Sequence, residues 1–132
     1  MSYTTFEYAD LRIELAGLPN GVLARVRCRV SNTGARAGDE VVQLYIGDER
    51  SDLPRPPREL KAFRKVRLEP GAAAELVFDL GAEAFRYWHP GRGGWVIEPG
   101  GFTVAVGASS RDLRLTGRLE LDSAQTTGNH SR

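Results

Sequence analysis

The sequence has little of what a disulfide-stapled domain, a membrane protein or a metalloenzyme needs. It contains one cysteine, Cys28, so no internal disulfide can form, and only two histidines, His89 and His130. No run approaches the roughly 18–20 apolar residues that a membrane-spanning helix requires. No basic start followed by an apolar core marks a signal peptide. Cytoplasmic and secreted locations both stay open, because a stable domain of this size can lack disulfides in either place.

An excess of charge of either sign is also missing. Lys and Arg together number 18, and Asp and Glu together number 17. A balance this even argues against nucleic acid or an acidic membrane surface as the main partner. No spacing of Cys, His and Asp resembles a zinc site or a facial triad, so we expect neither a metal nor another cofactor.

Reactive groups do not gather in any pattern that is typical of catalysis. A Ser–His–Asp triad would have to combine His89 with Ser109 or Ser110, and nothing around these serines resembles a nucleophile elbow. Carboxylates such as Glu75 and Asp79 alternate with apolar residues, which is typical of a solvated strand face rather than of a paired acid and base. We therefore expect no catalytic residue in this chain.

Strand-like alternation is what the sequence does contain. One run of small apolar side chains alternates with Arg25, Arg27 and Arg29, which predicts a strand with one buried face and one cationic, solvated face. Cys28 lies on the apolar side, and we expect a buried small hydrophobe there rather than a reactive thiol. A second run at 41–46 is β-branched and aromatic, as strands are.

Similar short runs recur along the chain with turn residues between them. Further strands are expected at 2–15 with a bulge or bend at Ala9–Asp10, at 60–68, 72–80, 102–106 and 113–121, and a hairpin is expected at 86–98. Side chains expected to be buried in the 60–68 strand are Leu60, Phe63, Val66 and Leu68, and a bulge is expected at Gly117. A proline-rich loop with Pro54, Pro56 and Pro57 precedes that strand.

Strands at this spacing predict a two-sheet antiparallel sandwich of seven to nine strands over residues 2–121. The polar segment 122–132 is expected to be a disordered tail. An immunoglobulin domain would show a disulfide between its sheets and a buried Trp, whereas here Cys28 has no partner and the following strand carries Tyr45. These residues favour the fibronectin type III-like variety of immunoglobulin-like sandwich.

A basic segment spans residues 50–67, where seven basic residues outnumber two acidic ones. One interpretation is a solvated strand edge whose charges block strand-to-strand aggregation. The other is a docking face for an acidic partner or a neighbouring domain, made by Arg55, Arg58, Lys61 and Arg64. Nucleic acid fits poorly, because no aromatic stacking platform is interleaved with these charges.

An aromatic cluster lies within residues 85–95 and consists of Phe85, Tyr87, Trp88 and Trp95. Alternation places Phe85 and Tyr87 on one side of the strand and Trp88 on the other, so Trp88 is the candidate for exposure. One interpretation is packing in the core or against a neighbouring domain, with Tyr87 as a corner tyrosine. The alternative is a carbohydrate- or polymer-binding platform with Tyr87, Trp88 and Trp95 as its contacts.

Four segments occur in an order that is shared with a known family. They are SYTTFEYADLRI at 2–13, VSNTGARAGDEVVQLYIGD at 30–48, RPPRELKAFRKVRLEPG at 55–71 and PGGFTVAVGASSRDLRL at 99–115. Together they resemble the C-terminal fibronectin type III-like domain of family three glycoside hydrolases, the β-glucosidase and β-xylosidase group. The resemblance covers about residues 2–121.

This resemblance implies a role without chemistry of its own. In that family the nucleophilic Asp lies in an N-terminal barrel domain, and the acid/base Glu usually comes from a second α/β domain. Neither domain is among these 132 residues, and no catalytic residue can be carried over to a position here. The resemblance implies an accessory domain of a β-glucosidase-like enzyme whose intramolecular partners are the catalytic domains. Carbohydrate stays a further candidate ligand because of the aromatic cluster.

Overall fold

The structure, a computed structural model, describes residues 4–49 and 58–122. Its strands are β1 (Phe6–Glu14), β2 (Ala24–Asn32), β3 (Gly38–Asp48), β4 (Glu59–Leu68), β5 (Ala73–Leu80), β6 (Tyr87–His89), β7 (Gly94–Val96), β8 (Gly100–Ser109) and β9 (Asp112–Leu121), and a short 3₁₀ turn, η1, spans Ala82–Ala84. The proline-rich loop, Arg55 and the expected tail from residue 123 onward lie outside the described residues.

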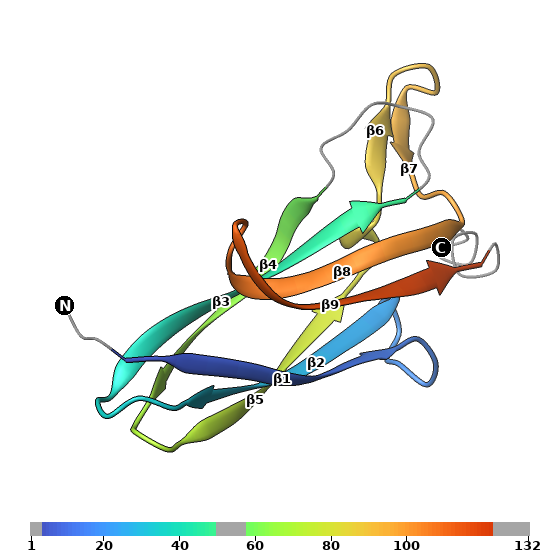
Figure 1. Ribbon diagram of the computed structural model, residues 1–132. Coiled ribbons are helices and arrows are strands. Elements are labelled where there is room, and N and C mark those ends of the chain that lie inside the picture. The colour runs from blue at the N-terminus through green and yellow to red at the C-terminus, as the bar shows by residue number, and fades with distance from the viewer. Residues whose placement is uncertain (1–3, 50–57, 123–132) are drawn as a thin grey trace.

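Two antiparallel sheets make up the body of the domain. One has the strand order β1-β2-β5 and the other β4-β3-β8-β9, while β6 and β7 pair with each other as a separate hairpin. Figure 1 shows the two sheets as facing layers, with the hairpin projecting beyond one end of them. The nine strands confirm the predicted sandwich, and the hairpin lies within the segment predicted for it.

The core lies between the layers because alternate residues of each strand point inward. In β2 the even-numbered residues from Ala24 to Asn32 are buried, while the arginines between them are not. The largest side chains that are fully buried come from both sheets and from the turn between β5 and β6: Phe78, Phe85, Phe102, Leu44 and Leu121. The cationic outer face that the sequence predicts for β2 is therefore confirmed.

Three backbone irregularities lie where the sequence predicts a bend or a turn. The register of β1 against β2 shifts between Ala9 and Arg12, and Asp10 has a φ of 59°, which confirms the expected bend. Gly21 and Gly71 have φ values of 89° and 80°, which side-chain-bearing residues rarely adopt. Each glycine lies in a predicted turn between two strands.

Two expectations about side chains in β4 are wrong, and one about β9 is wrong as well. Leu60 and Phe63 are exposed rather than buried. Lys61 is an extra residue in the pairing of β4 with β3, and this bulge turns Leu60 to the outer face, where Phe63 also lies. Gly117 pairs in register with Val104, so there is no bulge at that position.

The absence of a side chain at Gly117 has a different cause. A Cβ there would lie 3.2 Å from the tips of both Leu11 and Ile13, which pack across β9 from β1. The register of β8 against β9 shifts at Gly107 instead, between Val106 and Ser109.

None of the helical segments in the described ranges is long and apolar enough to cross a membrane.

Candidate functional site

The aromatic cluster divides into a buried half and an exposed half. Phe85 and Tyr87 are buried, and the ring of Phe85 meets that of Phe102 edge-on at a centroid distance of 5.1 Å. Trp88 and Trp95 are 51% and 52% exposed. The predicted exposure of Trp88 is confirmed, because alternation along β6 turns it away from the face that carries Tyr87.

The two tryptophans are cross-strand neighbours in the hairpin. Trp88 pairs with Trp95 in the β6–β7 register, and their rings lie 5.6 Å apart at an interplanar angle of 83°. The guanidinium of Arg86 lies 4.6 Å from the centre of the Trp95 ring and occupies one of its faces. The indoles therefore present a perpendicular pair, not the coplanar flat surface on which successive sugar rings would stack.

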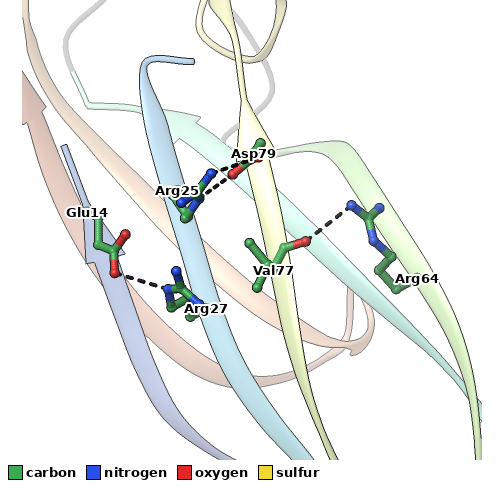
Figure 2. A network of polar contacts seen from close by, with 6 residues as sticks. All are labelled: Glu14, Arg25, Arg27, Arg64, Val77 and Asp79. Carbon is green, nitrogen blue, oxygen red and sulfur yellow. Dashed lines mark hydrogen bonds and ion pairs between the residues drawn. The ribbon is translucent and has the colours of Figure 1, made fainter. Parts of the chain in front are cut away.

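Of the side chains proposed as a basic docking face, the three that the structure describes have different surroundings. Lys61 forms an ion pair with Glu59 at 2.9 Å, while Arg58 lines a groove on the outer side of β8 and β9. Arg64 points toward the other sheet, where Nη2 donates to the Val77 carbonyl at 3.2 Å, as Figure 2 shows. Arg64 thus closes the gap between β4 and β5.

The arginines of β2 are held by carboxylates of the neighbouring strands. Nε of Arg25 lies 2.6 Å from Oδ1 of Asp79, and Nε of Arg27 lies 3.0 Å from Oε2 of Glu14 (Figure 2). The hydrogen bond from Arg25 holds the pKa of Asp79 below its usual value. Because these charges are exposed and cross-strand, they keep the outer face of the three-stranded sheet hydrated and add little to stability.

The buried amide of Asn32, at the end of β2, joins several segments of the chain through hydrogen bonds. The amide nitrogen of Asn32 donates to the carbonyls of Arg36 and Leu68 at 2.8 and 2.9 Å. Its side-chain oxygen accepts from the Thr4 hydroxyl at 2.7 Å and from the Gly34 backbone at 2.9 Å. All four hydrogen-bonding positions of the amide are used, and they join the start of the described chain to β2, its following loop and the end of β4.

The Asn-Thr-Gly motif therefore has a structural explanation. A Cβ on Gly34 would lie 2.0 Å from the Thr4 hydroxyl oxygen and 2.9 Å from the Thr5 backbone nitrogen. Only a glycine leaves room for the incoming chain to pass this close to the loop. The sequence contains the short polar motif Asn-Thr-Gly. The alternation of β2 predicts an inward side chain at Asn32 only if the strand is extended as far as that residue.

Arg114 fastens β1 across the opening between the sheets. Its Nη1 donates to the Phe6 carbonyl at 2.8 Å, its Nε lies 2.7 Å from Asp112, and its guanidinium covers the ring of Tyr8. The Tyr8 hydroxyl in turn donates to Glu40 at 2.8 Å, and burial together with this bond raises the pKa of Tyr8. Because the side chains of Tyr8, Glu40, Asp112 and Arg114 bond or pack against one another, they hold neighbouring strands together.

Cys28 has the environment expected of a core residue. It is buried in β2, and burial raises the pKa of its thiol to about 11. Only the thiolate is strongly nucleophilic, and about one thiol in a thousand would be ionised at pH 8.

We expect the native chain to resist thiol labelling at pH 8. A disulfide reagent such as Ellman's reagent should modify Cys28 within minutes in denaturant and should leave it essentially unmodified over the same time without denaturant. The denatured sample is the control for reagent and protein concentration. Rapid stoichiometric labelling of the folded chain would show that Cys28 is accessible and would contradict its assignment to the core.

No group of three His, Cys, Asp or Glu residues within 4–49 and 58–122 is arranged to hold a metal ion. What the described chain presents is a packed scaffold with an ion-paired face and an exposed aromatic hairpin. The fold defined by the 3 + 4 arrangement of its antiparallel strands is an immunoglobulin-like β-sandwich.

Comparison with known proteins gives the family. The model of the fibronectin type III-like domain matches residues 40–110, and the chain belongs to this family. It is 38% identical over 123 residues to thermostable β-glucosidase B of Acetivibrio thermocellus and 43% identical over 120 residues to a β-glucosidase of Bacteroides ovatus. These matches cover 93% and 91% of the chain but 16% of each relative.

Solved structures agree with the sequence comparison. The structure superposes on a family three β-glucosidase of Bifidobacterium adolescentis with a TM-score of 0.84 and 38% identity, covering 92% of this chain and 18% of that one. The predicted resemblance to the fibronectin-like domain of family three glycoside hydrolases is confirmed. The chain spans less than one-fifth of the length of these relatives.

Proposed function

We propose that this chain is a non-catalytic accessory domain of a β-glucosidase-like glycoside hydrolase and that it stabilises the enzyme by packing against its catalytic domains. The observation that carries the proposal is the likeness, over 91–93% of the chain, to a 16% portion of β-glucosidases. A segment that accounts for so little of an enzyme supports a partial role within it. The parent activity of the proposal is hydrolysis of O-glycosidic bonds in carbohydrates.

The polar chemistry of the described residues supports a scaffold. Glycosidic cleavage needs two carboxyl groups about 5–10 Å apart, one of them with a raised pKa. Two carboxyl groups have the opposite property: hydrogen bonds from Arg25 and Arg114 lower the pKa values of Asp79 and Asp112. These carboxylates are cross-strand or neighbouring partners of arginines and are poor general acids.

We expect the isolated chain to hydrolyse no aryl β-glucoside. Release of nitrophenol from the aryl glucoside should equal the buffer blank at protein concentrations at which an intact β-glucosidase exhausts the substrate. The intact relative from Acetivibrio thermocellus is the positive control. Turnover by the pure chain that one carboxylate substitution within it abolishes would overturn the proposal.

Binding of carbohydrate by the Trp88–Trp95 hairpin is the rival function. Exposure of both indoles favours it, whereas their perpendicular packing and the Arg86 guanidinium over Trp95 oppose it. A pull-down on insoluble glucan and a titration with cello-oligosaccharides separate the two functions. Binding at millimolar ligand that is lost in Trp88→Ala would favour the rival, and no binding leaves the accessory role.

A further inference from the structure

The two outer faces of the sandwich differ sharply in character. The outer face of the three-stranded sheet carries the ion pairs of Arg25 and Arg27. Among the described residues, five large hydrophobic side chains are exposed: two on the hairpin and three, Val41, Leu60 and Phe63, on β3 and β4 of the other sheet. Their exposed fractions are 41%, 48% and 60%. A solvated sheet face has no need of side chains of this kind.

The strand register places these residues in one continuous area. Leu60 lies opposite Tyr45, and Tyr45 lies opposite Ala105 on the next strand. Phe63 lies opposite Gln43, which is the neighbour of Val41 on the same face of β3. Cross-strand neighbours on one face have Cβ atoms about 5 Å apart. We call the area formed by the exposed side chains of Val41, Leu60 and Phe63 the apolar sheet face. Tyr45 and Ala105 belong to the same side of the sheet but are only 9% and 1% exposed, so they add little to the accessible surface.

A groove lies beside this area on the outer side of β8 and β9. Small side chains line its floor, including Thr103, Ala105 and Thr116, and the Glu49–Arg118 ion pair forms part of its wall. Ala105 lines the groove and lies opposite Tyr45, which places the groove next to the apolar sheet face. A ridge with large apolar side chains beside a groove with small ones is a surface that can interlock with a partner, as the cores of stable interfaces do.

The charges around the apolar sheet face indicate which kind of partner fits. Glu59 and Asp39 form ion pairs with Lys61 and Arg67. Within the described chain Lys65, which lies opposite Val41, and Arg58, at the groove, have no carboxylate partner. Arg118 pairs with both Glu49 and Glu120, so five basic side chains face four acidic ones among these described residues, and the border is net basic by one charge. A second copy would bring like charges together, whereas an apolar surface with acidic residues at its border would pair with them.

We propose that the apolar sheet face docks onto the catalytic part of the parent glycosidase, at a surface with an apolar centre and an acidic border. This rests on the proposed accessory function and adds the face that carries it. The relatives supply a partner of sufficient size, because more than four-fifths of their chains lie outside the matching segment. Phe63 is the central anchor, since truncation or charge at an aromatic residue of a buried interface usually has the largest effect.

A chimaera of thermostable β-glucosidase B in which this chain replaces the matching segment provides the test. Melting temperatures are measured for the chimaera and for the isolated chain, each unmodified and with Phe63→Glu, Lys65→Glu or Arg29→Glu. The last two are matched charge reversals on opposite outer faces. Surface substitutions change the stability of a small domain by little, so each should shift the isolated chain by no more than about 2 °C.

In the chimaera, Phe63→Glu should lower the melting temperature by several degrees more than it does in the isolated chain. Lys65→Glu should show a smaller excess of this kind, and Arg29→Glu should show none. If the shifts are equal in the two proteins while the chimaera melts as one unit, the docking face is wrong and the accessory function stands. If the unmodified chimaera melts in separate steps, with one at the temperature of the isolated chain, the accessory function fails. If Phe63→Glu only dissociates a dimer of the isolated chain, a second copy is the occupant and the proposal is overturned.

Discussion

Replacing Asn32 with alanine should lower the free energy of unfolding of this domain by about 3 kcal/mol, a large part of the 5–15 kcal/mol that small domains have. The amide makes four hydrogen bonds and is almost fully buried. Alanine would leave the Leu68 carbonyl and the Gly34 N–H without their partners in a place that water does not easily reach. Each orphaned buried group costs about 1–3 kcal/mol. Urea unfolding followed by tryptophan fluorescence measures the loss.

Two further variants separate hydrogen bonding from side-chain volume. Asn32→Asp keeps the volume but puts a carboxylate against the carbonyls of Arg36 and Leu68, so its folded-state pKa should be raised and its stability should increase as the pH falls through that pKa. Thr33→Ala, at the exposed neighbouring position, should cost less than about 1 kcal/mol. An Asn32→Ala loss no larger than that of Thr33→Ala would contradict the role of Asn32 as a hub.

Replacing Phe85 with alanine should have an effect of similar or greater size, about 3–5 kcal/mol. Phe85 follows η1, is fully buried and packs edge-on against Phe102 of β8. It is the side chain that ties the base of the β6–β7 hairpin to the sandwich, and its removal leaves a cavity next to Ala84 and Phe102. The loss is measured by urea unfolding, and near-ultraviolet circular dichroism should report loosening of the Trp88–Trp95 pair.

Controls for Phe85 come from the same segment. Phe85→Leu should recover much of the stability, because most of the volume is retained. Trp88→Ala removes a larger ring, but at an exposed position. Apart from the loss of the contact with Trp95, it should lower the free energy of unfolding by less than about 1 kcal/mol. If Trp88→Ala destabilised the domain more than Phe85→Ala, the assignment of buried and exposed halves of the aromatic cluster would be wrong.

Much of this structure follows from local patterns in the sequence. The alternation around Cys28 fixes which face of β2 is buried, and the phase change at Ala9–Asp10 predicts the bend that the φ of Asp10 confirms. The exposed side of Trp88 also follows from alternation. In each case neighbouring residues alone decide the outcome, because a strand has a period of two.

What the sequence did not predict depends on pairing between distant strands. Leu60 shares its phase with Leu68 and would point inward in a regular strand, but the extra residue at Lys61 reverses it. The position of that bulge depends on β3. Likewise, Arg64 bonds Val77, 13 residues away, and two of the four partners of Asn32, Thr4 and Leu68, lie 28 and 36 residues away. Charge count alone does not show that Arg64 is turned toward the opposite sheet, because that contact depends on how β4 and β5 come together.

Heat inactivation of three proteins measures the central claim most directly: intact thermostable β-glucosidase B, the same enzyme without the segment that matches this chain, and the chimaera that carries this chain instead. An accessory packing role predicts that deletion lowers the temperature of half-inactivation by many degrees or abolishes folding, and that the chimaera recovers most of the loss. A deleted enzyme that keeps its turnover and inactivates at the same temperature as the intact one would contradict the account.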